Sequence, residues 1–220
     1  MCRRNSTRCG TSRSLIHMFD RPGSAIAVGA VGGLAWAASL RAYMAELAGS
    51  ATGMEWVGTF AQILLPGVLV GALLGLAEFF RRTGGRRGWR WLAAAPALFA
   101  VAPQFTPEAF ITLVTTGIGG GAVSVALIGI GGGYALSGRG PLWARIVTGA
   151  LAAVLTIGSA AVAFFLPLTA RSVEPRAVWV ALLFASLMVV FALACSIPHR
   201  PLVHRDTVTP AAAASPSSQA

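Results

Sequence analysis

One apolar stretch, followed at once by a cluster of arginines, constrains this chain more than any other feature. Residues 56–80 carry only Thr59, Gln62 and Glu78 as clearly polar interruptions. As an α-helix this stretch is about 37 Å long, which exceeds the roughly 30 Å hydrocarbon core of a bilayer. We therefore predict that it crosses a membrane.

The arginines after this stretch predict its orientation. Arg81, Arg82, Arg86, Arg87 and Arg90 follow directly. A short loop rich in basic residues stays on the cytoplasmic side of a membrane. We predict that this loop is cytoplasmic and that it lies against the anionic headgroups of the lipid bilayer.

Composition agrees with a membrane protein. Hydrophobic residues make up 55% of the chain, charged residues make up 11%, and the mean hydropathy is +0.72. So few polar side chains cannot cover a water-soluble domain. The net charge of +10 comes from arginines that cluster beside apolar segments, so we expect lipid contact and no nucleic-acid partner.

The hydropathy pattern predicts an all-α, polytopic integral membrane protein with about six transmembrane helices. The predicted spans are 23–40, 56–80, 88–105, 110–136, 146–166 and 177–197. Pro96 and Pro103 interrupt the third segment, so a partial crossing is the alternative there. With six spans both termini are cytoplasmic, and the cytoplasmic segments hold fourteen of the 17 basic residues.

The ends of the chain differ in composition from its middle. Residues 1–22 are rich in Arg, Ser and Thr and predict a disordered basic tail, although Met18 is an alternative start. Residues 23–198 form the predicted transmembrane domain. Residues 199–220 end in TPAAAASPSSQA and predict a second disordered tail. Both tails are predicted to be cytoplasmic, in a protein of the inner or plasma membrane.

Glycine spacing predicts how the helices pack. Gly67, Gly71 and Gly75 form a GxxxGxxxG run on one side of the second span, and Gly29 and Gly33 share this spacing in the first. Small residues let helix backbones approach closely in lipid, where the hydrophobic effect no longer drives association. We expect these spans to pack through their glycines.

The predicted fourth span contains GIGGG twice, at 117–121 and 129–133. On a helix, Gly117, Gly121, Gly131 and Gly132 share one face. The pattern is typical of a helix packed between neighbours. A broken helix, whose unwound glycines line a substrate or ion site, is the alternative. Val125 is expected to face lipid.

Few polar groups lie at membrane depth, and Glu78, Arg82 and Gln62 are the candidate functional residues. An acid inside a span suggests proton or cation handling. Arg81 and Arg82, three and four residues further on, offer the other interpretation, which is a structural ion pair. Gln62 is expected to form a hydrogen bond between helices.

The sequence predicts no catalytic, cofactor or metal site. Cys2, Cys9 and Cys195 form no disulfide or zinc pattern. The segment GIGGGA at 117–122 matches a dinucleotide-binding motif, but no acid between Glu108 and Glu174 could hold a ribose.

We therefore expect a non-enzymatic membrane component or complex subunit, acting as a homo-oligomer or with a membrane partner. The alternative is a small transporter or channel that uses Glu78 and the glycine-rich fourth helix.

Overall fold

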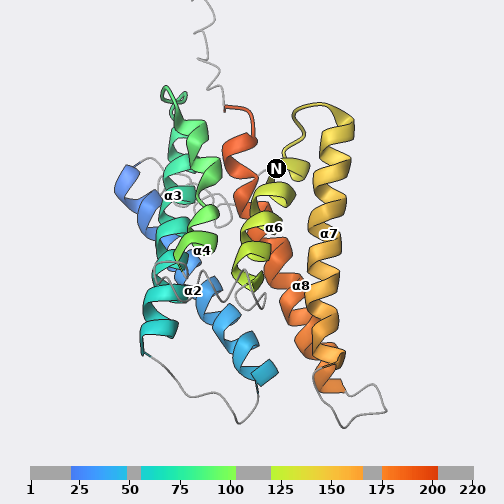
Figure 1. Ribbon diagram of the computed structural model, residues 1–220. Coiled ribbons are helices and arrows are strands. Elements are labelled where there is room, and N and C mark those ends of the chain that lie inside the picture. Colours follow the sequence, from blue (N-terminus) through green and yellow to red (C-terminus); the bar gives the residue numbers. More distant parts are fainter. Residues whose placement is uncertain (1–20, 49–55, 103–119, 166–174, 203–220) are drawn as a thin grey trace, which may run out of the picture.

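The computed structural model describes residues 21–48, 56–102, 120–165 and 175–202 (Figure 1). Over these ranges the chain forms helices and turns, and they include no strand. The helical segments long and apolar enough to cross a membrane are Pro22–Leu47, Val57–Arg82, Leu142–Val162 and Pro175–His199. These features confirm the predicted all-helical membrane class.

The helices form two groups that lie side by side (Figure 1). One group pairs α2 (Pro22–Ala48) with α3 (Leu65–Arg82), which continues the π-helix η2 (Val57–Leu64). The other packs α6 (Gly120–Leu136), α7 (Leu142–Phe165) and α8 (Pro175–Cys195) against one another. The groups meet where α2 contacts α8 and where the short helix α4 (Ala97–Val101) contacts α6.

The backbones of α2 and α3 touch where both helices carry glycine. A Cβ atom added at Gly71 would overlap the carbonyl oxygen of Gly29 and lie 2.8 Å from the Cα of Gly33. A Cβ atom at Gly33 would in turn overlap the carbonyl oxygen of Gly67. Such close approach gains many small dispersion contacts along the whole interface, and no residue larger than glycine leaves room for it.

Small residues also let α6 fit between two neighbours. A Cβ atom at Gly133 would lie 2.7 Å from the backbone of Cys195 in α8, and one at Gly131 would lie 3.4 Å from the carbonyl oxygen of Thr148 in α7. The second GIGGG, at 129–133, lies inside the continuous helix α6. The alternative of a broken helix is therefore wrong for this copy. Gly117 lies outside the described residues.

Two positions on α6 differ from the prediction. Gly121 is exposed, and a Cβ atom there would meet no described atom within 4 Å. Val125, expected to face lipid, is only 5% exposed and packs in the core with Ile128. A helical projection gives the relative angles of residues, but it does not show which angle faces a neighbour or how far that neighbour extends.

The predicted third span is two short pieces rather than one helix. A 3₁₀ helix, η3 (Trp89–Ala94), is followed by α4, with Pro96 between them. Proline has no backbone N–H to continue a helical ladder, and its ring clashes with the preceding turn. Together the pieces extend about 22 Å at most, which is less than a full crossing. Residues 103–119 lie outside the described ranges.

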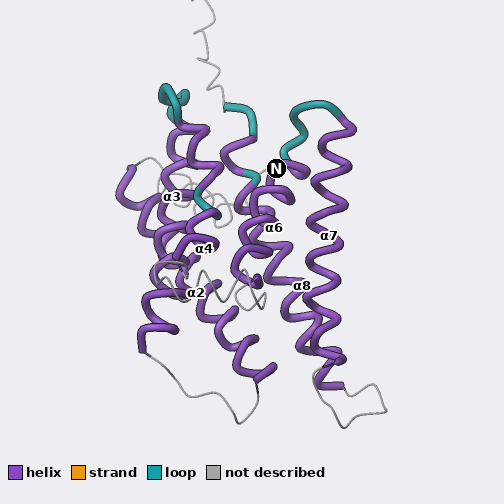
Figure 2. Tube along the Cα trace, in the orientation of Figure 1, coloured by secondary structure: helices purple, strands orange, loops and turns teal. Residues whose placement is uncertain are grey.

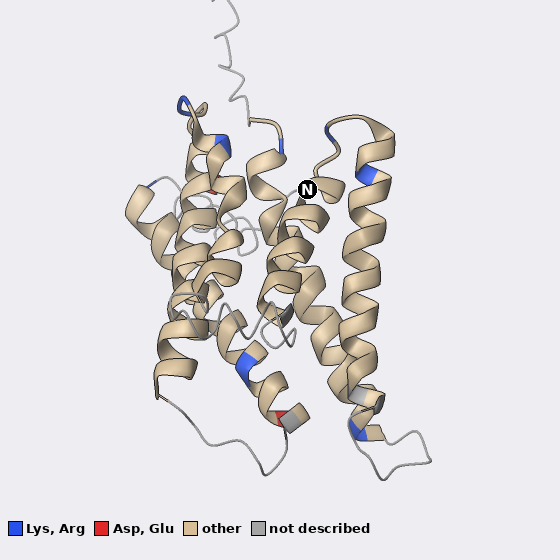
Figure 3. Cartoon of the chain, viewed as in Figure 1, with Lys and Arg blue, Asp and Glu red and all other residues tan. Residues whose placement is uncertain are grey.

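Charge is distributed unevenly between the two ends of the bundle. The described loops after α3, after α6 and after the 3₁₀ helix η5 (Ile197–His199) gather at one end (Figure 2), where basic residues concentrate (Figure 3). The arginines in or beside these loops are Arg81, Arg82, Arg86, Arg87, Arg90, Arg139, Arg145 and Arg200. At the opposite end Arg176 pairs with Glu46 at 2.7 Å. We call the first end the basic end.

The outer surface between these ends is apolar. Along α7, Ile146, Val154 and Ile157 are each at least 60% exposed, and Leu182 and Val189 are similarly open on α8. A continuous apolar face of this size is unusual on a soluble monomer and suits contact with hydrocarbon. It agrees with the length and hydropathy of these helices.

We expect Gly71→Ala to lower the free energy of unfolding by about 1–3 kcal/mol, because the new methyl group must push two backbones apart. Gly158→Ala is the matched control, since a Cβ atom at Gly158 in α7 meets nothing within 4 Å. It should leave stability unchanged or raise it by up to about 1 kcal/mol through helix propensity. Denaturant unfolding of the purified protein in detergent measures both, and equal effects would contradict the close packing of α2 on α3.

Candidate functional site

Glu78 lies in the last turns of α3, and its carboxylate is held by the two arginines that follow. Arg81 donates from Nε to Oε2 and from Nη2 to Oε1, both at 2.7 Å. Arg82 donates from Nε to Oε1 at 2.6 Å. Spacings of three and four residues place all three side chains on one helix face. A carboxylate that accepts three charge-assisted hydrogen bonds is fixed in position.

This triad is partly shielded from solvent. The side chains of Glu78, Arg81 and Arg82 are 12%, 17% and 33% exposed. Shielding strengthens the attraction between opposite charges and makes it more costly to lose one partner. Removing one member of the triad should therefore cost more stability than breaking an ion pair on an open surface.

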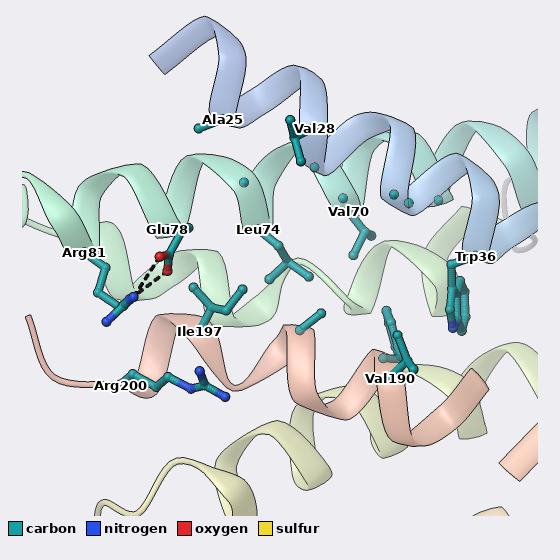
Figure 4. Close-up of a pocket in the computed structure, with 18 of the residues that line it drawn as sticks. Ala25, Val28, Trp36, Val70, Leu74, Glu78, Arg81, Val190, Ile197 and Arg200 are labelled. Carbon is teal, nitrogen blue, oxygen red and sulfur yellow. Dashed lines mark hydrogen bonds and ion pairs between the residues drawn. The ribbon is translucent and has the colours of Figure 1, made fainter. Parts of the chain in front are cut away.

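A slot of about 530 Å³ begins beside the triad and runs between α2, α3 and α8. One wall is the glycine interface, formed by Gly29 and Gly33 together with Gly67, Gly71 and Gly75, and the facing wall includes Val190 and Ala194 of α8. Glu78, Arg81 and Arg200 line it at the basic end (Figure 4). The slot is thus apolar along its length and charged at one end.

An aromatic cluster lines the other end of the slot. The Trp36 ring stacks on Phe191 with centroids 4.4 Å apart, and it meets the edge of Phe99 at 5.3 Å. Its Nε1 donates to the carbonyl oxygen of Leu187 at 2.8 Å. Because these residues come from α2, α4 and α8, the cluster joins the two helix groups at the end of the slot away from the arginines.

Arg200 is positioned by the end of α8. Its Nε donates to Oγ of Ser196 at 3.1 Å, and that hydroxyl donates to the carbonyl oxygen of Leu193 at 2.7 Å. Ser196 is fully buried and holds one nitrogen of the guanidinium group, while Arg200 as a residue is exposed. The α8 side of the slot therefore presents a third guanidinium group.

The structure brings together only some of the predicted residues. Glu78 and Arg82 line the slot with Gly67, Gly71 and Gly75. Gln62 lies in η2, and Gly131 and Gly132 lie in α6; none of these three is among the described residues that line the slot.

Sequence reasoning missed Trp36, Phe99, Phe191 and Arg200. From the sequence, the three aromatic residues could not be distinguished from other apolar residues within the predicted spans. Arg200 belongs to a segment that was predicted to be a disordered tail. A basic residue directly after a span was the available signal for Arg200.

The described residues offer few other chemical groups. No cluster of three or more His, Cys, Asp or Glu side chains suited to a metal ion occurs within these ranges. Cys195 is buried against Gly133, and only 1% of it is exposed. The triad and the slot are thus the features that can carry a functional proposal.

We expect Glu78→Gln to lower the free energy of unfolding by about 1–3 kcal/mol, because two partly buried guanidinium groups lose their counter-charge. Adding Arg81→Gln should recover part of that loss, which a double-mutant cycle measures. Glu46→Gln is the control, since the Glu46–Arg176 pair is far more exposed, and it should cost less than about 1 kcal/mol. Equal losses at Glu78 and Glu46 would show that the triad behaves as a surface ion pair.

No protein-family model matches the chain, and neither a curated protein nor a solved structure shows significant similarity to it. The function proposed below therefore rests on the geometry of the triad, the slot and the charged ends.

Proposed function

We propose that this protein is a non-enzymatic component of the inner or plasma membrane, acting as a subunit or assembly partner. The observation that carries this proposal is the engagement of Glu78 with both Arg81 and Arg82. An acid that carries protons or cations must exchange partners during a cycle. A carboxylate with three short hydrogen bonds to neighbours on its own helix fits a structural role better.

In this proposal the basic end is cytoplasmic. Short cytoplasmic loops collect Arg and Lys, and the loops between α3 and η3 and between α6 and α7 do so here. Exposed tryptophans support the same placement, because indole rings favour the membrane–water interface. Trp91 and Trp143 lie near the basic end, while Trp56 and Trp179 lie near the other.

The proposal keeps six crossings with both tails cytoplasmic. The chain turns back after α3 through η3 and α4, which pack alongside that helix. It then rises to the basic end through α6. The proposal needs one return crossing between α3 and α6, and η3 and α4 form the described part of it. The glycine contacts of α2, α3 and α6 then stabilise the bundle within lipid.

A small transporter or channel remains the second candidate, because the slot begins directly beside Glu78. An acid at the mouth of a cavity inside a membrane is the arrangement that a proton-coupled carrier would use. The two candidates differ in what the carboxylate must do, so they can be separated by changing that group alone.

We expect purified wild-type protein in liposomes to show no proton flux above that of empty liposomes, and Glu78→Gln to leave this level unchanged. Internal pH dyes measure the flux, and melting in detergent checks that the variant is folded. Proton flux through the wild type that disappears in Glu78→Gln would make a transporter or channel the favoured function.

We also expect an impermeant thiol reagent to label intact cells at Gly49→Cys and Ser172→Cys but not at Gly84→Cys, in a background without Cys2, Cys9 and Cys195. All three positions should react after the cells are opened. Labelling of Gly84→Cys in intact cells would reject the cytoplasmic assignment of the basic end.

A further inference from the structure

We propose that the slot binds one acyl chain of an anionic phospholipid from the cytoplasmic leaflet, with the phosphate of that lipid beside Arg82 and Arg200. The leaflet in this inference rests on the proposed orientation of the basic end. The binding itself rests on the shape and charge of the slot, which do not depend on that orientation.

The depth of the slot matches a single leaflet. Along α3 its lining extends from Arg82 to Gly67, and the part between Glu78 and Gly67 covers about 16 Å of helical rise. Half of the hydrocarbon core of a bilayer is about 15 Å thick. The aromatic cluster of Trp36, Phe99 and Phe191 lies toward that deep end. A chain that enters from the basic end would therefore end near the bilayer midplane.

The walls suit hydrocarbon and disfavour a polar solute. Away from the charged end they consist of glycine backbones, aliphatic side chains such as Val70 and Leu74, and aromatic rings. A polar ligand buried there would leave its hydrogen-bonding groups without partners, which strongly disfavours its binding. An acyl chain has no such groups.

The size of the slot suits a single acyl chain. Its volume is about 530 Å³. Cavities of a few hundred Å³ are the usual size for small-molecule ligands.

Charge selects an anionic headgroup. Among the described residues, Arg81, Arg82 and Arg200 line the charged end together with Glu78. Arg200 lies directly after η5, while Arg81 and Glu78 lie on α3 (Figure 4). Guanidinium groups bind phosphate oxygens through paired hydrogen bonds. A phosphate at this end of the slot would meet guanidinium groups from two parts of the chain.

Trp36 provides a readout inside the slot. We would prepare a protein in which Trp56, Trp89, Trp91, Trp143 and Trp179 are phenylalanine, and place it in nanodiscs of zwitterionic phospholipid. Adding an anionic phospholipid with brominated acyl chains should quench Trp36 fluorescence, because bromine quenches only at close range. No quenching, or equal quenching by the brominated zwitterionic lipid, would overturn the proposal.

Two matched pairs of variants test the mode of binding. Gly32→Leu should abolish the quenching, because Gly32 lines the slot and a Cβ atom there meets nothing within 4 Å. Gly158→Leu, equally open but on α7, should not change it. Arg200→Gln should weaken the apparent affinity about fivefold, whereas Arg139→Gln, which removes the same charge at the same end, should not.

Further measurements identify the bound ligand and separate an error in the slot proposal from an error in the orientation. A brominated fatty acid that quenches as well as the phospholipid would show that a free carboxylate is the ligand and would overturn the proposal. Native mass spectrometry of the protein with its original tryptophans should show a bound anionic phospholipid that Gly32→Leu loses. The thiol-labelling experiment tests orientation independently, so a reversed topology and an empty slot give different results.

Discussion

The direct contact of the α2 and α3 backbones is the constraint on which the rest of the structure depends. In hydrocarbon, apolar side chains gain nothing by leaving lipid for protein, so helices associate through close van der Waals packing. Here the backbones pack closely where Gly29 and Gly33 of α2 face Gly67, Gly71 and Gly75 of α3. This pairing sets the positions of Glu78 at the basic end of α3 and of Trp36 on α2.

The slot is a consequence of the same contact. Glycines bring the two helices together, but they offer no side chains to fill the space between this pair and α8. The large side chains of Trp36, Phe99 and Phe191 fill the space between the two helix groups, but only at the end of the slot away from the arginines. Between that end and the arginines, the interface remains unfilled.

The arginines act differently according to what surrounds them. Arg81 and Arg82 neutralise and hold a partly buried acid, whereas Arg200 is anchored by Ser196 and adds charge beside them. Arg139 and Arg145 lie at the same end without lining the slot. The number of arginines at the basic end therefore bears on the orientation of the protein. The position of Arg81, Arg82 and Arg200 on the slot bears on the kind of ligand that it could hold.

Hydropathy, residue spacing and charge along the chain were enough to predict an all-helical membrane protein and to place Glu78 three and four residues before its arginines. These properties are local, because helical geometry and membrane thickness act on each segment by itself. The burial of Val125, the aromatic cluster and the slot were decided only by tertiary structure. They depend on how each neighbouring helix is rotated and how far it extends, and hydropathy gives neither, because an apolar side chain can face lipid or protein equally well.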